Sequence, residues 1–393
     1  MKNIGTISWG IKAPIIRPGD DLVEITCDSV MKAVKEGKIK LKDRDIVAVT
    51  EAVVAKSQGN FATVDDIAKD VREKMGEGTV GVIFPILSRN RFSNILKGIA
   101  RGCDNLIIQL SYPFDEVGNP LVSIDKLYEK GVTNFNKTYT EKQFYKLVGK
   151  IEHPFTGLDY IDVYKKICGE NCRIILSNDP TTILKYTKKV ISADIHSRHR
   201  NKDLLLKRGA KKVITLDEIL NHSINGSGYN EEFGVLGSNL STDEKLKLFP
   251  RDTKTFVKKL QKRLCEVSGV KMECMVYGDG AFKDPVGGIW ELADPVVSPA
   301  YTSGLTGTPN EIKLKYVADN QIGDLKGKAA EEAIKDIINK KSKDLKNQNV
   351  SLGTTPRRYT DLLGSLADLT SGSGDKGTPI VLITGYFDNY ADE

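Results

Sequence analysis

Residues 43–59 read DRDIVAVTEAVVAKSQG, and this stretch sets the pattern for the rest of the chain. A charged turn precedes residues 45–49, whose apolar and β-branched side chains predict a buried strand. The strand is followed by a loop at residues 54–59 that contains Lys56. Junctions of this kind make backbone N–H groups and charged side chains available, so they are favoured places for a ligand.

The sequence on either side supplies further elements of the same small unit. On the N-terminal side, a short strand leads through a turn at residues 17–20 into a helix expected at 22–36. On the C-terminal side, apolar residues at helical spacing predict a helix over 63–73, with Thr63 as its N-cap.

From about residue 79 to residue 224, predicted strands alternate with predicted helices. This alternation is typical of βαβ units and therefore of a parallel sheet. No G-x-G-x-x-G fingerprint occurs in the block, so nothing in its sequence supports a dinucleotide site. We expect strands at 80–84, 105–110, 173–176, 191–195 and 211–214, and helices at 91–100, 180–189 and 199–207.

The third region begins near Phe233, after a linker expected at residues 221–230. Its predicted elements are a helix at 253–267, a strand at 272–276, helices at 329–345 and 359–369, and a strand at 380–383. We therefore predict the α/β fold class, with a mixed α+β core made from both chain ends. The core comprises 1–78 and 229–393, and a Rossmann-like α/β insert comprises 79–228.

Composition limits the function classes that need to be considered. The 393 residues are 40% apolar and 28% charged, which is ordinary for a folded protein. The net charge of +6 is spread along the chain, so we expect no nucleic-acid partner. We find no apolar run that could cross a membrane and no secretory signal, and we expect a cytoplasmic protein. The pairs Cys168/Cys172 and His196/His199 do not form a recognised zinc pattern.

Four loops, at residues 13–21, 54–59, 276–282 and 371–379, join predicted strands to turns rich in Gly, Asp or Pro. The last loop could cradle phosphates, but its order of Gly, Lys and Thr is not a Walker A motif, and a surface turn is the simpler interpretation. Asp279 could hold a divalent ion or could stabilise its own turn. Lys56 taken alone is a weak signal, because most lysines are solvated.

Taken together, these stretches resemble the coenzyme F420-0:L-glutamate ligases, a family of γ-glutamyl ligases. API-IRPGDDL followed by DRDIVAVTEAVVAKSQG is similar to the family's first signature. The family's second signature resembles the stretch that begins with GVLGSNL and continues through the following helix to MVYGDGAF. The family's C-terminal signature resembles YTDLLGSLADLTSGSGDKGTPIVLITGY. The three matches occur in the family's order.

The resemblance implies a GTP- or ATP-dependent acid–amino-acid ligase that uses Mg²⁺ or Mn²⁺. Such an enzyme activates a carboxylate as an acyl phosphate, which the amine of L-glutamate then attacks. The partners implied are a small-molecule carboxylate acceptor, L-glutamate and a second copy of the chain in a homodimer. Asp279 would hold the metal ion. The nucleotide would be contacted by Pro14, Ile15, Ile16, Lys56, Asn239, Gly372, Ser373, Gly374, Asp375, Lys376, Gly377, Thr378 and Pro379.

The chain departs from the family's pattern at several positions. The metal-binding Asp of the family's GIDASN stretch corresponds to Leu236, and the Thr after the second metal Asp corresponds to Gly280. The Ser and Thr before the family's VVSKAEG become Glu51 and Ala52. The candidates to replace the missing carboxylate are Glu51, Asp20, Asp21 and an acidic residue of the insert. Two alternatives therefore stay open: nucleotide-dependent phosphoryl transfer without amide formation, and a nucleotide-binding or regulatory protein without catalysis.

Overall fold

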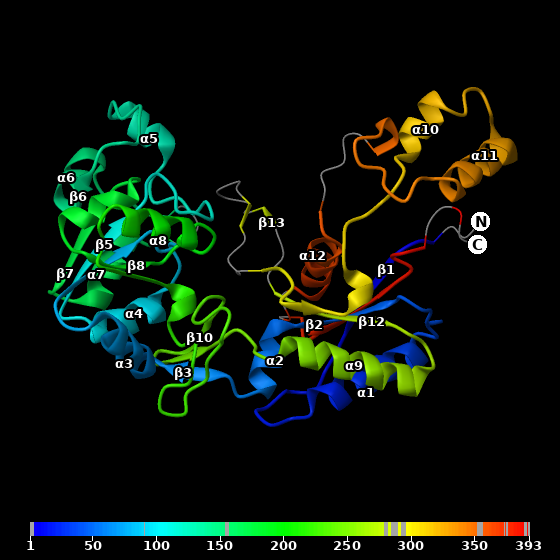
Figure 1. Ribbon diagram of the computed structural model, residues 1–393, viewed down its shortest axis with the longest axis horizontal. Helices are drawn as coiled ribbons and strands as arrows, with labels where there is room; N and C mark the ends of the chain where they lie inside the picture. Colours follow the sequence, from blue (N-terminus) through cyan, green and yellow to red (C-terminus); the bar gives the residue numbers. More distant parts are fainter. Residues whose placement is uncertain are drawn as a thin grey trace.

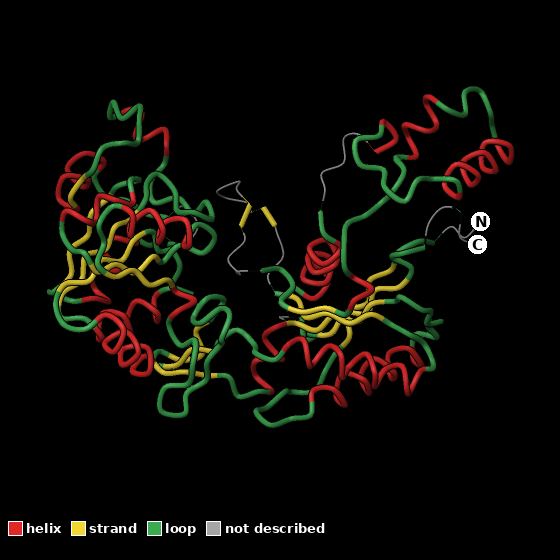
Figure 2. The backbone as a smooth tube through the Cα atoms, viewed as in Figure 1, coloured by secondary structure: helices red, strands yellow, loops and turns green. Residues whose placement is uncertain are grey.

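The computed structural model describes residues 4–89, 91–153, 157–278, 282–283, 290–291, 296–351, 357–372, 374, 376–388 and 391. Figure 1 shows two lobes, one built from both ends of the chain and the other from its middle. Figure 2 shows a large sheet in each lobe and a short sheet at their junction. The predicted α/β class is confirmed, because parallel and antiparallel strands are combined with helices throughout.

The core lobe is built on a five-stranded sheet in which β2 and β12 are parallel and all other neighbours are antiparallel. Alternate residues of its strands face opposite sides, as strand geometry requires. Val47 and Val49 pack with the helices α1 (Leu22–Glu36) and α9 (Thr253–Ser268), whereas Ile46 and Ala48 pack with α12 (Tyr359–Ser371). The strand order is β1 (Ile7–Ile11), β16 (Ile380–Thr384), β2 (Ile46–Thr50), β12 (Glu273–Tyr277), β15 (Ala300–Tyr301).

The middle of the chain forms a six-stranded sheet that is parallel except for the edge strand β6. Helices cover both faces, with α3 (Val64–Met75), α4 (Ser93–Gly102) and α7 (Tyr160–Cys168) on one and α8 (Arg198–Lys207) on the other. The strand order is β6 (Tyr139–Thr140), β7 (Cys172–Leu176), β5 (Asn105–Leu110), β4 (Thr79–Ile83), β8 (Lys189–Ser192), β9 (Lys212–Thr215).

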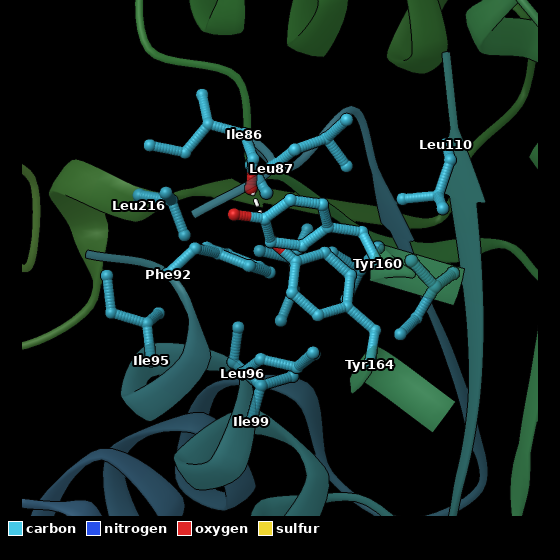
Figure 3. Close-up of a cluster of buried hydrophobic side chains, with 14 of the residues drawn as sticks. Ile86, Leu87, Phe92, Ile95, Leu96, Ile99, Leu110, Tyr160, Tyr164 and Leu216 are labelled. Atoms are coloured by element: carbon cyan, nitrogen blue, oxygen red, sulfur yellow. Dashed lines mark hydrogen bonds between the residues drawn. The ribbon is translucent and has the colours of Figure 1, made fainter. Parts of the chain in front are cut away.

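The hydrophobic cluster of this second lobe extends beyond the residues 79–228 expected for the insert. Figure 3 shows part of the cluster, where Tyr164 of α7 lies among aliphatic side chains of α4 and of the loop after β4. Ile67 of α3 and Leu236 belong to the same cluster. Ala62 and Leu246 join it from the short sheet at the junction. That sheet has the order β10 (Asn239–Thr242), β11 (Lys245–Lys247), β3 (Phe61–Thr63).

The chain passes between the lobes twice, and the two crossing segments are hydrogen-bonded to each other. The Gln58 side chain donates to the Arg251 carbonyl (2.5 Å) and accepts from the Arg251 N–H (3.1 Å). Asn60 is fully buried, and its amide donates to the carbonyls of Tyr229 (3.0 Å) and Phe249 (2.8 Å). Residues near 60 and 250 therefore mark the junction.

The remaining elements are short. Two expected helices differ from the structure: residues 180–189 form only a 3₁₀ helix, η1 (Pro180–Lys185), and the helix expected at 329–345 is α11 (Gly327–Asn339). The β-branched run Thr181, Thr182, Ile183 disfavours the α-helix at the first site. The others are α2 (Glu51–Ser57), α5 (Ile124–Glu129), α6 (Glu141–Val148), α10 (Leu314–Asn320), β13 (Phe282–Lys283), β14 (Trp290–Glu291), η2 (Leu216–Glu218), η3 (Ser303–Leu305) and η4 (Asn349–Ser351).

Candidate functional site

Three segments that adjoin strands meet at one edge of the five-stranded sheet: the start of α2 after β2, the end of β12, and the stretch before β16. The loop expected at residues 54–59 is wrong in part, because α2 (Glu51–Ser57) follows β2 directly and continues through Lys56. β2 and β12 are parallel and in register, with Thr50 opposite Tyr277, so both strands end at this edge. The antiparallel strand β16 begins there, and the Thr50 N–H donates to the Pro379 carbonyl at 3.0 Å. We call this place the carboxyl edge; the segments around residues 51, 278 and 371–379 meet there.

A buried ion pair lies next to the carboxyl edge. Glu51, the first residue of α2, is 6% exposed, and its Oε1 lies 2.7 Å from Nζ of Lys247 on β11. Lys247 lies opposite Asn239 in the short sheet. The half-buried Asn239 is thus held beside a cation that reaches from the second lobe into the core.

The C-terminal loop is folded mainly on its own hydrogen bonds. Gly372, Gly374 and Gly377 have φ values of 57°, 84° and 74°, a region that favours glycine. The N–H of Gly374 donates to the Ser371 carbonyl and that of Gly377 to the Gly374 carbonyl, so these two N–H groups point into the loop. The exposed Lys376 lies over Gly372. Ser373 and Asp375 lie outside the described residues.

Thr378 shows why β1 contains a glycine at residue 10. The hydroxyl of Thr378 is buried and has no hydrogen-bond partner within the described residues. A Cβ atom at Gly10 would lie 3.2 Å from this hydroxyl, so Gly10 allows the loop to approach the strand. The Thr378 hydroxyl is therefore a buried polar group just before β16 that lies against β1.

The metal ligand implied at Asp279 lies outside the described residues. The chain before it is well held, because the Gly278 N–H donates to the Val297 carbonyl at 2.9 Å. Burial raises the pKa of the Tyr277 hydroxyl, and the nearby Ser371 hydroxyl partly offsets this. Tyr277 therefore stays neutral at physiological pH, and its ring packs with Leu363 and Ala367 of α12.

The other residues that the resemblance assigns to nucleotide contact differ in burial: some are exposed on the surface and one is buried in the core. Lys56 is exposed on α2. Pro14 and Ile15 are exposed, Ile15 to 79%, whereas Ile16 is buried in the core cluster with α1 and α9. The loop before α1 is joined to the end of α2, because the Gly19 N–H donates to the Ser57 carbonyl at 2.8 Å.

Most of the candidates for the missing carboxylate already have local structural roles. Asp20 accepts from the Arg17 N–H at 2.6 Å, and Asp21 caps α1 by accepting from the Val23 and Glu24 N–H groups. Glu51 remains, at the carboxyl edge but paired with Lys247. Among the described residues, no group of three His, Cys, Asp or Glu is arranged to hold a metal ion.

Leu236 does not face the carboxyl edge as a vacant ligand position. It is 2% exposed and belongs to the apolar cluster of the second lobe, beside Val235 and Phe249.

The Cys168 and Cys172 thiols are hydrogen-bonded to each other, which raises the pKa of Cys168 and lowers that of Cys172. Both cysteines are free rather than bridged.

Sequence reasoning did not identify Lys247 or Thr50 as residues near this edge. The periodicity of a three-residue strand such as β11 is too short to read from sequence. Thr50 could have been found, because it ends a fully buried strand directly before the segment with Lys56.

Within the described part of the chain, no helix is both long enough and apolar enough for a membrane crossing.

Two comparisons with known proteins bear on the family of this chain. A curated relative, the coenzyme F420:L-glutamate ligase of Methanosarcina acetivorans, is 39% identical over 56 residues, which are 14% of this chain. The matched part is 18% of that relative, so the chain spans under a fifth of its length in the alignment. The family described as "F420-0:Gamma-glutamyl ligase" matches residues 10–385, which include both lobes. The chain belongs to the F420-0:gamma-glutamyl ligase family.

Proposed function

We propose that this protein is a GTP- or ATP-dependent ligase that adds L-glutamate to a carboxylate of a cofactor-like small molecule. The nucleotide's γ-phosphoryl group is transferred to the acceptor carboxylate, which gives an acyl phosphate and a nucleoside diphosphate. The amine of glutamate attacks the acyl carbon, an amide bond forms, and inorganic phosphate leaves. Bound Mg²⁺ or Mn²⁺ would neutralise charge on the phosphates.

The observation that supports this proposal is the meeting of the start of α2, the end of β12 and the stretch before β16 at the carboxyl edge of the core sheet. Phosphate-binding sites need several donors held in place from different segments, and a rigid sheet supplies this. Thr378 offers a buried hydroxyl there and Lys376 positive charge, while Asn239 and Lys247 lie opposite each other on the short sheet beside it. Asp279 would hold the metal ion, and Glu51 is the candidate carboxylate at the carboxyl edge that would assist it.

The acceptor class is suggested by the relatives. The matching protein from Methanosarcina acetivorans is named for coenzyme F420 and L-glutamate, so we propose a deazaflavin-type coenzyme first and a folate-like cofactor second. We also propose that the protein acts in the cytoplasm as a homodimer. Light scattering coupled to size-exclusion chromatography should give about twice the chain mass of 43.4 kDa.

Calorimetric titration with GTP and with ATP, each with and without Mn²⁺ or Mg²⁺, tests the proposal. We expect one nucleotide to bind only in the presence of metal, and Asp279→Ala to abolish this binding. The exposed Asp243 lies in the β10–β11 turn, and Asp243→Ala should leave the affinity unchanged as the matched control. Mass spectrometry should then detect an acceptor extended by one glutamate. Absence of binding by either nucleotide in the wild-type protein contradicts the proposal.

A second candidate is a nucleotide-binding or regulatory protein on the same fold that does not catalyse the reaction. The burial of Leu236 and the ion pair that engages Glu51 favour it, because both remove carboxylates from the carboxyl edge. Tight nucleotide binding without release of phosphate in the presence of glutamate and any acceptor would support this alternative. Phosphate release without amide formation would support phosphoryl transfer alone.

A further inference from the structure

Two of the six cysteines form a directly interacting pair in the second lobe, away from the carboxyl edge. Cys168 is the last residue of α7 and Cys172 is the first residue of β7, so only three residues separate them. The Cys168 thiol donates a hydrogen bond to the sulfur of Cys172. Both cysteines are free, so the pair is a dithiol in this structure.

The turn between the two cysteines is held by the backbone. Gly169 ends α7 with a φ of 73°, a conformation that favours glycine, and its N–H donates to the Lys165 carbonyl at 2.9 Å. The Asn171 carbonyl accepts from the Leu106 N–H of β5 at 3.0 Å, which fixes the chain directly before Cys172. The two thiols are therefore brought together by fixed elements rather than by a freely moving loop.

The two thiols differ in exposure and in acidity. Cys168 is half-buried, whereas Cys172 is 5% exposed. The hydrogen bond from Cys168 lowers the pKa of Cys172, and the ammonium group of Lys165 lowers it further, against the effect of burial. The same hydrogen bond raises the pKa of Cys168. Cys168 is thus the sulfur that an outside reagent reaches, and Cys172 is the sulfur that accepts the proton from it.

Two other thiols provide internal comparisons. Cys103 lies just before β5 and packs against the same apolar cluster as Cys168. Burial raises the pKa of Cys103 to about 12, so this thiol stays protonated at physiological pH and exchanges slowly. Cys265 on α9 is exposed but belongs to the core lobe. The structure therefore favours the pairing of Cys168 with Cys172 over any other.

We infer that Cys168 and Cys172 are a reversible modification site, which a low-molecular-weight disulfide oxidises to an intramolecular disulfide. The Cys168 sulfur attacks one sulfur of the outside disulfide, a mixed disulfide forms, and the first outside thiolate leaves. The Cys172 sulfur then attacks the sulfur of Cys168, the protein disulfide forms, and the second outside thiolate leaves. The protein loses two electrons and two protons, and the outside disulfide becomes two thiols.

The new bond would tie the end of α7 to the start of β7. Tyr164 lies one turn earlier on α7, and its hydroxyl donates to the Ile86 carbonyl and accepts from the Ser88 N–H at 3.0 Å. Figure 3 shows Tyr164 among the side chains that surround this loop after β4. Oxidation therefore acts on the helix that holds the loop. The site lies in the second lobe and does not depend on the proposed ligase function.

Equilibration of the full-length protein with mixtures of reduced and oxidised glutathione tests the inference, followed by denaturation, alkylation and digestion with trypsin. Cleavage after Lys166 and Arg173 releases residues 167–173, which contain both cysteines. With increasing oxidised glutathione, we expect this peptide to lose both alkyl groups together and to become two hydrogens lighter than the unalkylated reduced peptide. Reductant should reverse both changes, and Cys103 should stay available to the alkylating reagent throughout.

Single variants separate the two steps of the exchange. Cys172→Ser should stop at the mixed disulfide, so that Cys168 keeps one glutathione, whereas Cys168→Ser should leave Cys172 as a thiol. Cys265→Ser is the matched control and should form the disulfide as the wild-type protein does. In concentrated urea, the wild-type chain should need about tenfold more oxidised glutathione, because the fold no longer holds the sulfur atoms together.

Three results would overturn the inference: alkylation of both cysteines in the most oxidising mixture, pairing of either one with Cys103, or equal oxidation of the folded and the unfolded chain. Circular dichroism spectra of the variants should match that of the wild-type protein, which separates loss of the exchange from loss of folding. Nucleotide binding is measured in a different experiment, so failure of this inference and failure of the proposed ligase function are distinguishable.

Discussion

At the scale of single residues, the pair Glu51–Lys247 is a buried charge interaction between the two lobes. Its two side chains are 7% and 13% exposed, and the nitrogen-to-oxygen distance is 2.7 Å. Charges at this depth lose hydration, and the attraction between the partners offsets that cost only while both are present. Removing one partner should therefore cost more stability than the intact pair contributes, because the remaining charge stays buried without its counter-charge.

Lys247→Met should lower the free energy of unfolding by about 3 kcal/mol, because it leaves the Glu51 carboxylate buried without this cation. The double variant Lys247→Met/Glu51→Gln should recover most of the loss, since no buried charge is left uncompensated. Urea denaturation followed by circular dichroism measures both. Lys245→Met, at an exposed lysine on the same strand, should cost less than about 1 kcal/mol and is the control. Equal losses for the two lysine variants would contradict the prediction.

A second prediction at this scale concerns Leu236, which the resemblance aligns with a metal-binding Asp. Leu236→Asp should not create a metal site, because residue 236 packs in the apolar cluster of the second lobe. We expect a loss of at least about 3 kcal/mol at pH 8, and a smaller loss at pH 5 because a buried carboxyl is more easily accommodated when protonated. Leu236→Met should cost under about 1.5 kcal/mol. A gain in Mn²⁺ affinity by calorimetry for Leu236→Asp would contradict this account.

At the scale of elements, the strands were the most predictable part of the fold. Residues 46–49, 105–110 and 380–383 are apolar or β-branched runs, and each forms a buried strand at nearly the expected place. The short sheet of β3, β10 and β11 could not be predicted, because its strands have three or four residues and β3 pairs with β11 across some 180 residues of sequence. Periodicity over so few residues does not distinguish a strand from a loop.

The candidate site was predictable to a similar degree. Thr50, Pro379 and Gly278 are ends of strongly patterned strands, so their meeting at one edge follows once the strands pair. The burial of Ile16 and Leu236 could not be predicted, because it depends on which lobe each residue packs against. The packing of α3 could not be predicted for the same reason: the helix is amphipathic, and only the structure shows that its apolar face covers the six-stranded sheet.

Two loops of the second lobe predict an unusual pH dependence. Burial raises the pKa of Asp115, after β5, and of Asp194, after β8, each from 3.8 to about 6. At pH values between 3.8 and about 6, the folded state binds more protons than the unfolded state. The free energy of unfolding therefore increases as pH falls from 7 toward 4, and this gain is lost as pH rises through 6. Each pKa unit corresponds to about 1.4 kcal/mol, which gives up to about 3 kcal/mol per group.

Hydrogen exchange followed by mass spectrometry, corrected for intrinsic rates, checks this prediction peptide by peptide. Peptides from β5 and β8 should be better protected at pH 5 than at pH 7, and peptides from β2 in the core lobe should not share this change. Asp194→Asn should reduce the dependence, because its carboxyl no longer titrates; the amide still fits beside Ser192 and Asn201. Greater protection of β5 and β8 at pH 7 would show that the sign is wrong.

At the scale of the whole molecule, the double crossover between the lobes explains how one chain holds two sheets. Within the described residues, the main chain crosses between them near residues 60 and 250, and Asn60 hydrogen-bonds the second segment directly. Its oxygen accepts from the Tyr229 N–H (3.0 Å) and from the Arg251 guanidinium (3.2 Å), so it contacts the linker as well. A single buried side chain thereby fixes three segments at the junction.

Asn60→Ala should therefore loosen the junction without unfolding either sheet. The variant leaves the Tyr229 N–H and the carbonyls of Tyr229 and Phe249 without their Asn60 partner, at a cost of about 3 kcal/mol. Because the sheets have separate hydrophobic clusters, we expect calorimetric unfolding to split into two transitions and limited proteolysis to cut near residues 58–61 and 226–231. Asn105→Ala, at an exposed position on β5, should change neither measurement. If Asn60→Ala instead unfolds in one transition with the wild-type cleavage pattern, the lobes are coupled mainly by other contacts, and Lys247 with Glu51 becomes the first pair to examine.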